Sequence, residues 1–336
     1  MKKANMQTKV FRLALAAASF LAGSSLTFGQ TNAPALKYGL QVCYGMPNFT
    51  KPGEQGEIPV SRFAPASVNV KAWAHAAKES GMTFAVLTAK EWSGFCLWPC
   101  ADYDYDVGHS PFKRDVVGDF IAACKAEGIL PGVYYSVADA HNEGAVRWKG
   151  PVPSLYFQFI KKQITELQTK YPDIAVMTFD GSPRFSPEQW NELKQIVQRL
   201  NSQCVIMDTD RKEATPCSTA NTLLKNWFLP PVEPPEGVHR ASMLSQQYFQ
   251  AQNAGKAFLL NVGPWPSGNL PDNQLAVLKQ MKELVDNPPP TTPATATPEA
   301  KPDAAERLKK VKALYDQGLI NKEDYDKKVK EIMDSL

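Results

Sequence analysis

The polar side chains that could do chemistry in this sequence stand at the ends of short apolar runs. All but one of them are carboxylates or aromatic residues. The set is Cys43, Tyr44, Glu91, Trp92, Tyr135, Asp139, Asp180, Asp208 and Asp210. Paired carboxylates suit glycoside hydrolysis, in which one acid protonates the leaving oxygen and another stabilises an oxocarbenium-like centre. There is no G-x-S-x-G turn and no histidine set with metal-ligand spacing, so we expect neither a metal nor an organic cofactor.

Strand-like and helix-like segments alternate through most of the chain. The apolar runs cover 39–45, 84–89, 131–136, 175–181, 204–208 and 257–263, and the helical patterns cover 70–80, 113–127, 154–170, 187–200, 241–254 and 272–285. Such apolar runs are typical of strands buried on both faces. Gly81 and Gly128 follow two of the helical patterns and indicate helix ends. Repeated strand and helix predicts a parallel α/β fold.

Two parallel architectures fit this alternation, a doubly wound open sheet and a (β/α)8 barrel. No glycine-rich phosphate loop follows the first run, which disfavours the dinucleotide-binding form of the open sheet. Six strands are clear, and the proline-rich stretch 209–240 could add two more. We therefore predict an irregular (β/α)8 TIM-type barrel over residues 36–286. In such a barrel the polar residues at the strand ends share one face.

The first 30 residues are typical of a secretory signal peptide. Four basic residues, Lys2, Lys3, Lys9 and Arg12, precede a mostly apolar run at 13–22 that is followed by small residues. That run is short for a membrane anchor, which needs about 20 residues. We expect a secreted or periplasmic protein that is not held at the membrane after cleavage. Without the leader, 33 basic residues face 34 acidic ones, so nucleic-acid binding has no electrostatic support.

The six cysteines leave two alternatives open. They form no C-x-x-C pair and no cluster with zinc spacing. In an exported protein Cys204 could pair with Cys217, or Cys96 with Cys100, as disulfides. Alternatively, several of them are small buried hydrophobic residues.

The composition changes after residue 286. Residues 287–302 form a Pro/Thr/Ala-rich linker, which should be extended and semi-rigid. Residues 303–336 carry two short amphipathic patterns separated near Gly318. So small a unit buries little surface and needs a partner. It resembles the SHOCT helical module, and that resemblance implies a helical hairpin that supports homo-oligomer formation.

Four segments together resemble glycoside hydrolase family 29, the α-L-fucosidases: "TAKEWSGFCLWP", "YDVGHSPFKRDVVGDFIAACKAEGILPGVYYS", "FDG" and "FLLNVGPWPSGNLP". The resemblance runs from about residue 38 to residue 285. It implies an irregular barrel and a retaining mechanism through a covalent glycosyl-enzyme, with Asp180 of "TFDG" as the nucleophile. The leading interpretation is an exported glycoside hydrolase acting on a carbohydrate. The alternative is a non-catalytic carbohydrate-binding protein on a degenerate hydrolase barrel.

The sequence departs from the family pattern around the sugar. The family's I-H-W-G is V-C-Y-G at 42–45, and its T-A-K-H-H-D-G-F is T-A-K-E-W-S-G-F at 88–95. The tryptophan usually found two residues before the nucleophile corresponds to Thr178. We expect the sugar pocket to be lined by Tyr44, Glu91, Trp92 and Tyr135. Such changes should alter or abolish fucose recognition.

The acid/base residue is harder to place, because in this family it lies on a variable loop. Glu213 in "DTDRKEAT", with Arg211 nearby as a substrate-binding residue, resembles an R-x-G-N-E segment of one family branch without its G-N. Glu213 is our candidate, and Glu233 and Glu236 are its rivals. Glu91 could itself act as an acid.

Overall fold

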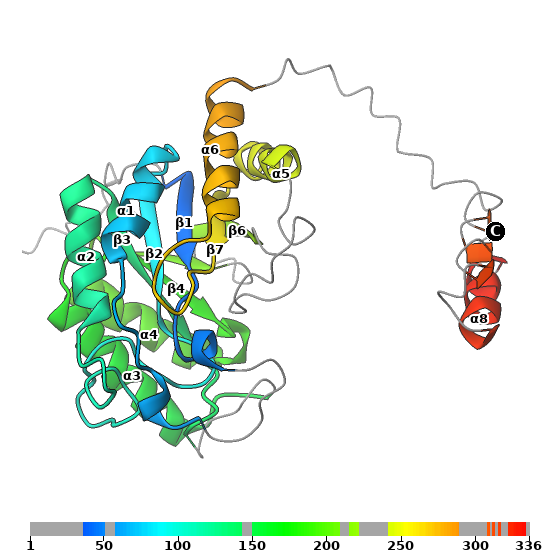
Figure 1. Ribbon diagram of the computed structural model, residues 1–336. Helices are drawn as coiled ribbons and strands as arrows, with labels where there is room; N and C mark the ends of the chain where they lie inside the picture. The colour runs from blue at the N-terminus through cyan, green and yellow to red at the C-terminus, as the bar shows by residue number, and fades with distance from the viewer. Residues whose placement is uncertain are drawn as a thin grey trace, which may run out of the picture. The chain divides into compact units, whose positions relative to one another are not determined.

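The computed structural model describes residues 36–50, 58–142, 150–208, 215–221 and 241–288, together with 308–309, 311–312, 315–316 and 322–333 (Figure 1). The chain divides into two units, Met1–Leu284 and Val285–Leu336, which are described separately. The predicted leader, most of the predicted linker and residues 209–214 lie outside the described residues.

The first unit is built on seven parallel strands that follow chain order around a closed ring. They are β1 (Tyr38–Val42), β2 (Phe84–Lys90), β3 (Leu130–Ser136), β4 (Val176–Asp180), β5 (Val205–Asp208), β6 (Thr215–Asn221) and β7 (Ala257–Val262). The predicted parallel α/β fold is confirmed, whereas the predicted (β/α)8 barrel is not, because the described ring has seven strands. Within the described residues β6 pairs directly with β5 and with β7, and β7 pairs with β1. The stretch 209–240 therefore supplies one strand of the described ring rather than two.

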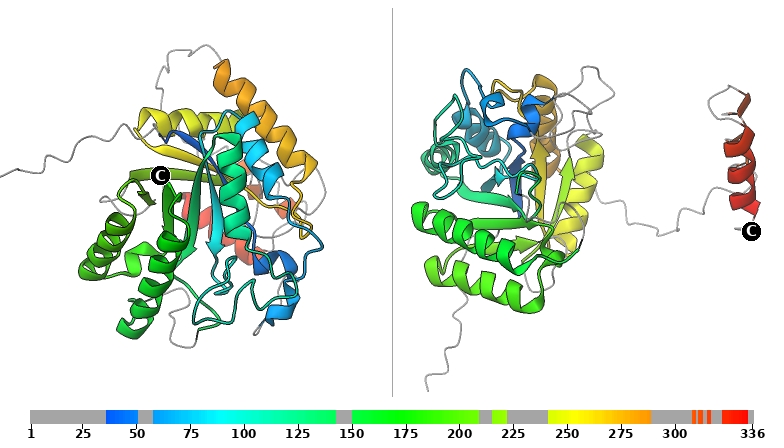
Figure 2. Two further views of the ribbon diagram at one scale, coloured as in Figure 1. Left: turned by 90° about the vertical axis from the view of Figure 1, so that its left-hand side faces the viewer. Right: turned by 90° about the horizontal axis from the view of Figure 1, so that it is seen from below.

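The helices of this unit lie outside the strands (Figures 1 and 2). They are α1 (Val70–Glu79), α2 (Val116–Glu127), α3 (Ser154–Lys170), α4 (Pro187–Leu200), α5 (Ala241–Asn253) and α6 (Asp272–Asp286). Local sequence sets their ends. The Asp115 side chain accepts a hydrogen bond from the Gly118 amide and starts α2. Gly128 ends it with φ 72°, a left-handed conformation that favours glycine.

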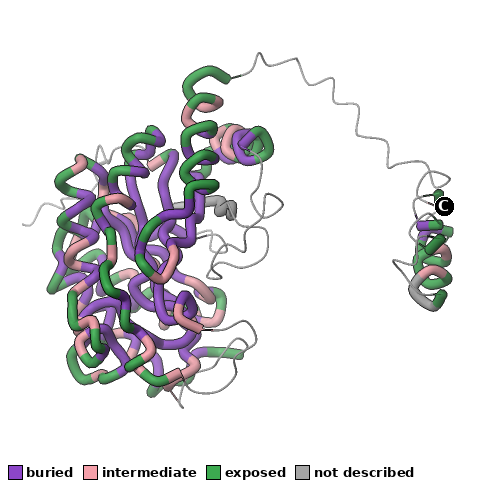
Figure 3. The backbone as a smooth tube through the Cα atoms, viewed as in Figure 1, coloured by how far each residue is buried: buried purple, intermediate pink, exposed green. Residues whose placement is uncertain are grey.

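The strands carry the core of the barrel (Figure 3). At the N-terminal end of the ring the interior is an apolar cluster of Phe84, Val86, Val176, Met207, Ala257 and Leu259. The apolar runs are thus buried on both faces, as the sequence predicts, because helices cover the outer face. Among the described residues, no helix has both the length and the hydropathy that crossing a membrane requires.

In the second unit the second predicted amphipathic helix is present as α8 (Lys322–Met333). The described residues 308–309, 311–312 and 315–316 of the first predicted helix are also helical. The rings of Tyr315 and Tyr325 approach to 4.8 Å between centroids, so the two segments contact each other. The resemblance to a SHOCT hairpin stays a prediction.

Candidate functional site

Strand alternation decides which side chains face the barrel interior. Successive residues of a strand point to opposite faces, and Val176 of β4 belongs to the interior cluster. Thr178 and Asp180 therefore face inward too. On β3, Tyr134 packs on the same interior cluster, so Ser136 also faces inward. The inward-facing residues at the carboxyl ends of these strands form the candidate site.

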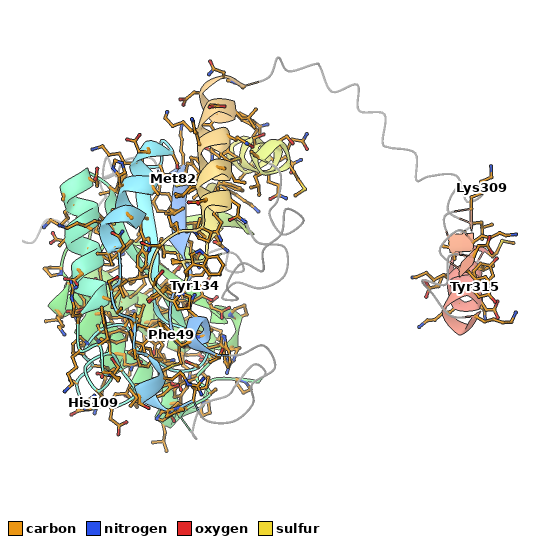
Figure 4. The ribbon with its side chains drawn as sticks, viewed as in Figure 1. Phe49, Met82, His109, Tyr134, Lys309 and Tyr315 are labelled. Carbon is orange, nitrogen blue, oxygen red and sulfur yellow. The ribbon has the colours of Figure 1, made fainter. Side chains whose placement is uncertain are left out.

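Asp180 is held at this edge by two hydroxyl groups from the neighbouring strand. Ser136 and Asp180 are register partners, and the Ser136 hydroxyl donates to Asp180 Oδ2 over 3.3 Å. The Tyr134 phenol also makes a hydrogen bond with the Asp180 carboxylate. Both Tyr134 and Asp180 stay partly exposed, although the strands around them are buried. Figure 4 labels Tyr134 among the strands of the barrel. Asp180 is thus an accessible, oriented carboxylate.

Burial, together with the groups around Tyr134, keeps its phenol protonated. Burial raises the pKa of Tyr134 well above its usual value, and the nearby Asp180 carboxylate raises the pKa further. Cys43 and Glu91 act on the same phenol in the same direction, as expected for residues at the ends of neighbouring strands. Tyr134 is therefore a fixed hydrogen-bond donor toward Asp180.

Glu91 lies just past β2 and is 1% exposed. The Ser93 amide donates to Glu91 Oε2 over 2.6 Å, and the Ser93 hydroxyl donates to Oε1. Gly45, after β1, lies so close that an added Cβ would meet Glu91 Cγ at 3.0 Å. Burial raises the pKa of Glu91 to about 7, with the Ser93 hydrogen bonds opposing the rise. The site therefore pairs a hydroxyl-bound carboxylate with a carboxyl group that holds its proton near neutral pH.

Trp92 lies next to Glu91 and is partly exposed. Its carbonyl accepts a hydrogen bond from the Ala140 amide over 2.9 Å, and the Ser93 carbonyl accepts one from the His141 amide over 3.1 Å. The loops after β2 and β3 are thus joined side by side. This arrangement supports the predicted place of Trp92 at the barrel mouth.

The prediction that Tyr44 lines the pocket is corrected by the structure. Tyr44 is fully buried, and its hydroxyl donates to the Pro266 carbonyl over 2.9 Å. Its ring packs among Phe49, Phe63 and Trp73, and Figure 4 labels Phe49 in this aromatic cluster. The inward-facing residue at this point of the chain is Cys43, one position earlier, because alternation turns its neighbour outward.

Tyr135 is corrected for the same reason. It is fully buried on the outer side of β3, where its hydroxyl donates to Gln163 Oε1 of α3 over 2.6 Å. The tyrosine that reaches the site is Tyr134, one position earlier. From the sequence "YY" alone, either tyrosine could face the barrel interior. Counting in steps of two along the strand from a known interior residue identifies Tyr134 as the inward-facing one.

Lys90 and Asp139 form a structural pair behind the site. Both side chains are 0% exposed, and Lys90 Nζ lies 3.3 Å from Asp139 Oδ2. Lys90 also donates to the carbonyls of Ser136 and Ala138. A register shift between Thr88 and Lys90 interrupts the alternation of β2 and turns Lys90 outward. Asp139, expected at the active face, is instead the partner of this lysine.

The structure describes the predicted cysteines but not the predicted acid/base residue. Glu213 and Arg211 lie outside the described residues. Cys96, Cys100 and Cys204 are free thiols, so neither suggested disulfide is formed. Within the described parts of the chain, no three His, Cys, Asp or Glu side chains gather as a metal site would need. Sequence reasoning missed Tyr134, Ser136 and Arg184. Arg184 follows β4, and its positive charge interacts with the Asp180 carboxylate.

The chain is similar to proteins of a known family. A family model described as alpha-L-fucosidase matches residues 37–287. The chain is 26% identical over 282 residues to "Alpha-L-fucosidase 1" of Arabidopsis thaliana, covering 68% of this chain and 54% of that protein. It therefore spans about half the length of this curated relative.

Solved structures show the same fold at low identity. α-L-fucosidase AlfC from Lactobacillus casei, in complex with α-L-fucose product, matches with a TM-score of 0.65 and 22% identity, covering 75% of this chain and 96% of that one. α-L-fucosidase isoenzyme 1 from Paenibacillus thiaminolyticus matches with a TM-score of 0.62 and 23% identity, covering 75% and 74%.

Proposed function

Because this chain belongs to the α-L-fucosidase family, we propose that it is a retaining glycoside hydrolase with Asp180 as its nucleophile. The observation that carries the proposal is the setting of Asp180. This carboxylate ends β4 at the carboxyl edge of the barrel and is bound by hydroxyls of Ser136 and Tyr134. Catalytic residues of such barrels stand at this edge.

The chemistry proceeds in two displacements. Asp180 attacks the anomeric carbon and forms a glycosyl ester while the bond to the leaving oxygen breaks. A carboxylic acid protonates that oxygen, and the resulting carboxylate then takes a proton from the water that hydrolyses the ester. Glu213 is the candidate for this second group on sequence grounds, with Arg211 as a neighbouring contact for the substrate.

The sugar pocket of this protein differs from the family pattern. Glu91 and Trp92 stand where the family has two histidines. A protonated Glu91 can donate one hydrogen bond to a sugar hydroxyl, and Trp92 offers a flat apolar face for stacking. We therefore expect weak turnover of simple α-L-fucosides and a different preferred glycoside.

The deciding experiment compares wild type with Asp180→Asn on a panel of aryl glycosides that includes the α-L-fucoside. Hydrolysis by wild type with retained anomeric configuration, abolished in a folded Asp180→Asn variant, is the expected result. Binding of a sugar by wild type without any turnover would instead favour a carbohydrate-binding protein on a hydrolase barrel.

We further propose that the protein is exported to a secreted or periplasmic location, and that residues 303–336 form a SHOCT-like hairpin that brings copies of the chain together. The leader sequence supports export. The apolar faces of the tail and the Tyr315–Tyr325 contact support the hairpin.

A further inference from the structure

Two buried thiols lie together between the segment that follows β2 and helix α3. Gln163 of α3 donates through Nε2 to Cys96 Sγ over 3.4 Å and to Cys100 Sγ over 3.3 Å. The two thiols also form a hydrogen bond with each other. Both are free in the structure, and the catalytic steps proposed above use neither of them.

The backbone holds the two cysteines against the same residue. Cys96 forms a bridge with Asp106, in which the Cys96 amide donates to the Tyr105 carbonyl over 3.1 Å and the Val107 amide donates to the Cys96 carbonyl over 2.9 Å. The Asp106 side chain in turn accepts from the Cys100 amide through Oδ2 over 2.6 Å. A disulfide forms without strain only where the backbone already brings the two side chains together, and Asp106 provides that arrangement.

Cys100 is the thiol that a reagent reaches first. Cys96 is fully buried, whereas Cys100 is 7% exposed. Cys100 Sγ lies 3.5 Å from Glu166 Oε2, and the Ala101 amide donates to the same carboxylate. Glu166 and Ala101 line a groove of about 720 Å³ between α3 and α4. This groove therefore leads from solvent to the neighbourhood of the Cys100 thiol.

Cys204 shows what a buried thiol without a reactive neighbour looks like in the same protein. Gln168 donates through Nε2 to Cys204 Sγ over 3.5 Å and to Met177 Sδ over 3.7 Å. A glutamine amide thus lies against two sulfur atoms here as well, but the second sulfur is a thioether, which cannot form a disulfide. Cys204 is therefore the internal comparison for the pair at Gln163.

We propose that Cys96 and Cys100 are a site of oxidation to a disulfide by exchange with an external disulfide. The Cys100 thiolate attacks one sulfur of the external disulfide, forms a mixed disulfide and releases one external thiolate. Cys96 then loses its proton to solvent and attacks the Cys100 sulfur, which releases the second external thiolate. Two protein thiols and one external disulfide thereby become one protein disulfide and two external thiols. The reaction uses neither Asp180 nor the sugar pocket, so it does not depend on the function proposed above.

The disulfide braces the segment that returns to the end of β2. Cys96 bridges Lys90, and the Leu97 amide donates to the Ala89 carbonyl over 2.8 Å. A cross-link removes conformational freedom from the unfolded chain, and less of it when the closed loop is short. Closing the short loop 96–100 should therefore raise the Tm of the barrel by roughly 5 °C.

The experiment incubates the folded full-length protein with oxidised glutathione and maps its disulfides by mass spectrometry without reduction. The expected product is a Cys96–Cys100 link with the loss of two hydrogen atoms, and a Tm higher by roughly 5 °C that dithiothreitol returns to its first value. In Cys96→Ser the second step is blocked, so glutathione should stay attached at Cys100. Cys100→Ser should form neither product, and Cys204→Ser should behave as wild type.

Three results overturn the inference. Free thiols at both Cys96 and Cys100 of wild type after the incubation would show that the pair does not exchange with disulfides. A lasting glutathione adduct on wild-type Cys100 would show that the two sulfur atoms do not meet. A link that forms but lowers the Tm would show that the backbone must move to close it. None of these readouts involves glycoside turnover, so failure of the proposed function would leave them unchanged.

Discussion

Replacing Glu91 by glutamine should change how the stability of the protein depends on pH. Burial raises the pKa of Glu91 from its ordinary value of 4.5 to about 7 in the folded state. Between these two values the folded protein holds a proton that the unfolded chain has released, so stability falls as pH rises through this window. Below pH 4.5 both states carry the proton, and above pH 7 neither does, so the effect is confined to the window.

The size of the effect follows from the same two values. Each tenfold change in proton affinity corresponds to about 1.36 kcal/mol, so ionisation of Glu91 costs roughly 3 kcal/mol across the whole window. Glutamine cannot ionise, and its carbonyl oxygen can still accept from the Ser93 amide. Relative to wild type, Glu91→Gln should therefore gain roughly 3 kcal/mol in unfolding free energy between pH 4 and pH 8. Urea unfolding at one-unit pH steps measures this difference.

Glu127 serves as a matched control, because its pKa is shifted in the opposite direction to that of Glu91. Hydrogen bonds from Lys78 and His75 lower the pKa of Glu127, a partly exposed residue at the end of α2. Its contribution to stability is therefore present above its unfolded pKa and is lost as the pH falls through the lower folded value. Glu127→Gln should therefore be less stable than wild type above that acidic range, and the difference should disappear as the pH falls through it. A stability difference between Glu91→Gln and wild type that does not vary from pH 4 to pH 8 would refute the reasoning, because Glu91 would then ionise as it does in water.

Three further predictions concern the groups around the site. Tyr134→Phe removes a hydrogen bond to the Asp180 side chain and should lower kcat by roughly tenfold or more. Tyr135→Phe changes a hydroxyl that is bound to Gln163 outside the barrel and should leave kcat unchanged. Equal losses in the two variants would contradict the assignment. Lys90→Met leaves the buried Asp139 carboxylate unpaired and should cost about 3–5 kcal/mol in denaturant unfolding; a loss below about 1 kcal/mol, the range of an exposed pair, would show that the pair is solvated. A chain ending at residue 287 should keep a folded barrel and show a lower association state by light scattering. The same number of chains per particle as in the full-length protein would count against an oligomerising tail.

The fold was predictable from the sequence because its signals are local and repeated. Apolar runs of five to seven residues placed six of the seven strands, and Asp115 and Gly128 mark the helix α2 through capping chemistry. The strand count was not predictable. The segment that holds β6 reads "TPCSTAN", which has few of the β-branched and aromatic residues that make a buried strand visible.

The candidate site was predictable in position but not in orientation. Asp180 and Glu91 lie at the strand ends where the sequence placed them. Tyr44 and Tyr135 were assigned to the pocket because they stand at strand ends and belong to a suitable residue type. Both point outward, and the side chains that face inward, Cys43 and Tyr134, are their immediate neighbours. A one-residue shift moves a strand's side chains to the other face, so residue type cannot replace the count along the strand.

The bulge in β2 shows why such a count must also follow the backbone. Strict alternation from Thr88 would turn Lys90 into the barrel, but the register shift between them turns it out to Asp139. The same lysine holds the carbonyls of Ser136 and Ala138 at the end of β3, just before the loop that is hydrogen-bonded to Trp92 and Ser93. A fully buried ion pair therefore fixes the two loops that carry the barrel mouth. Its loss should displace Glu91 and Trp92 although Lys90 itself faces away from the sugar, so stability and recognition are coupled through this pair.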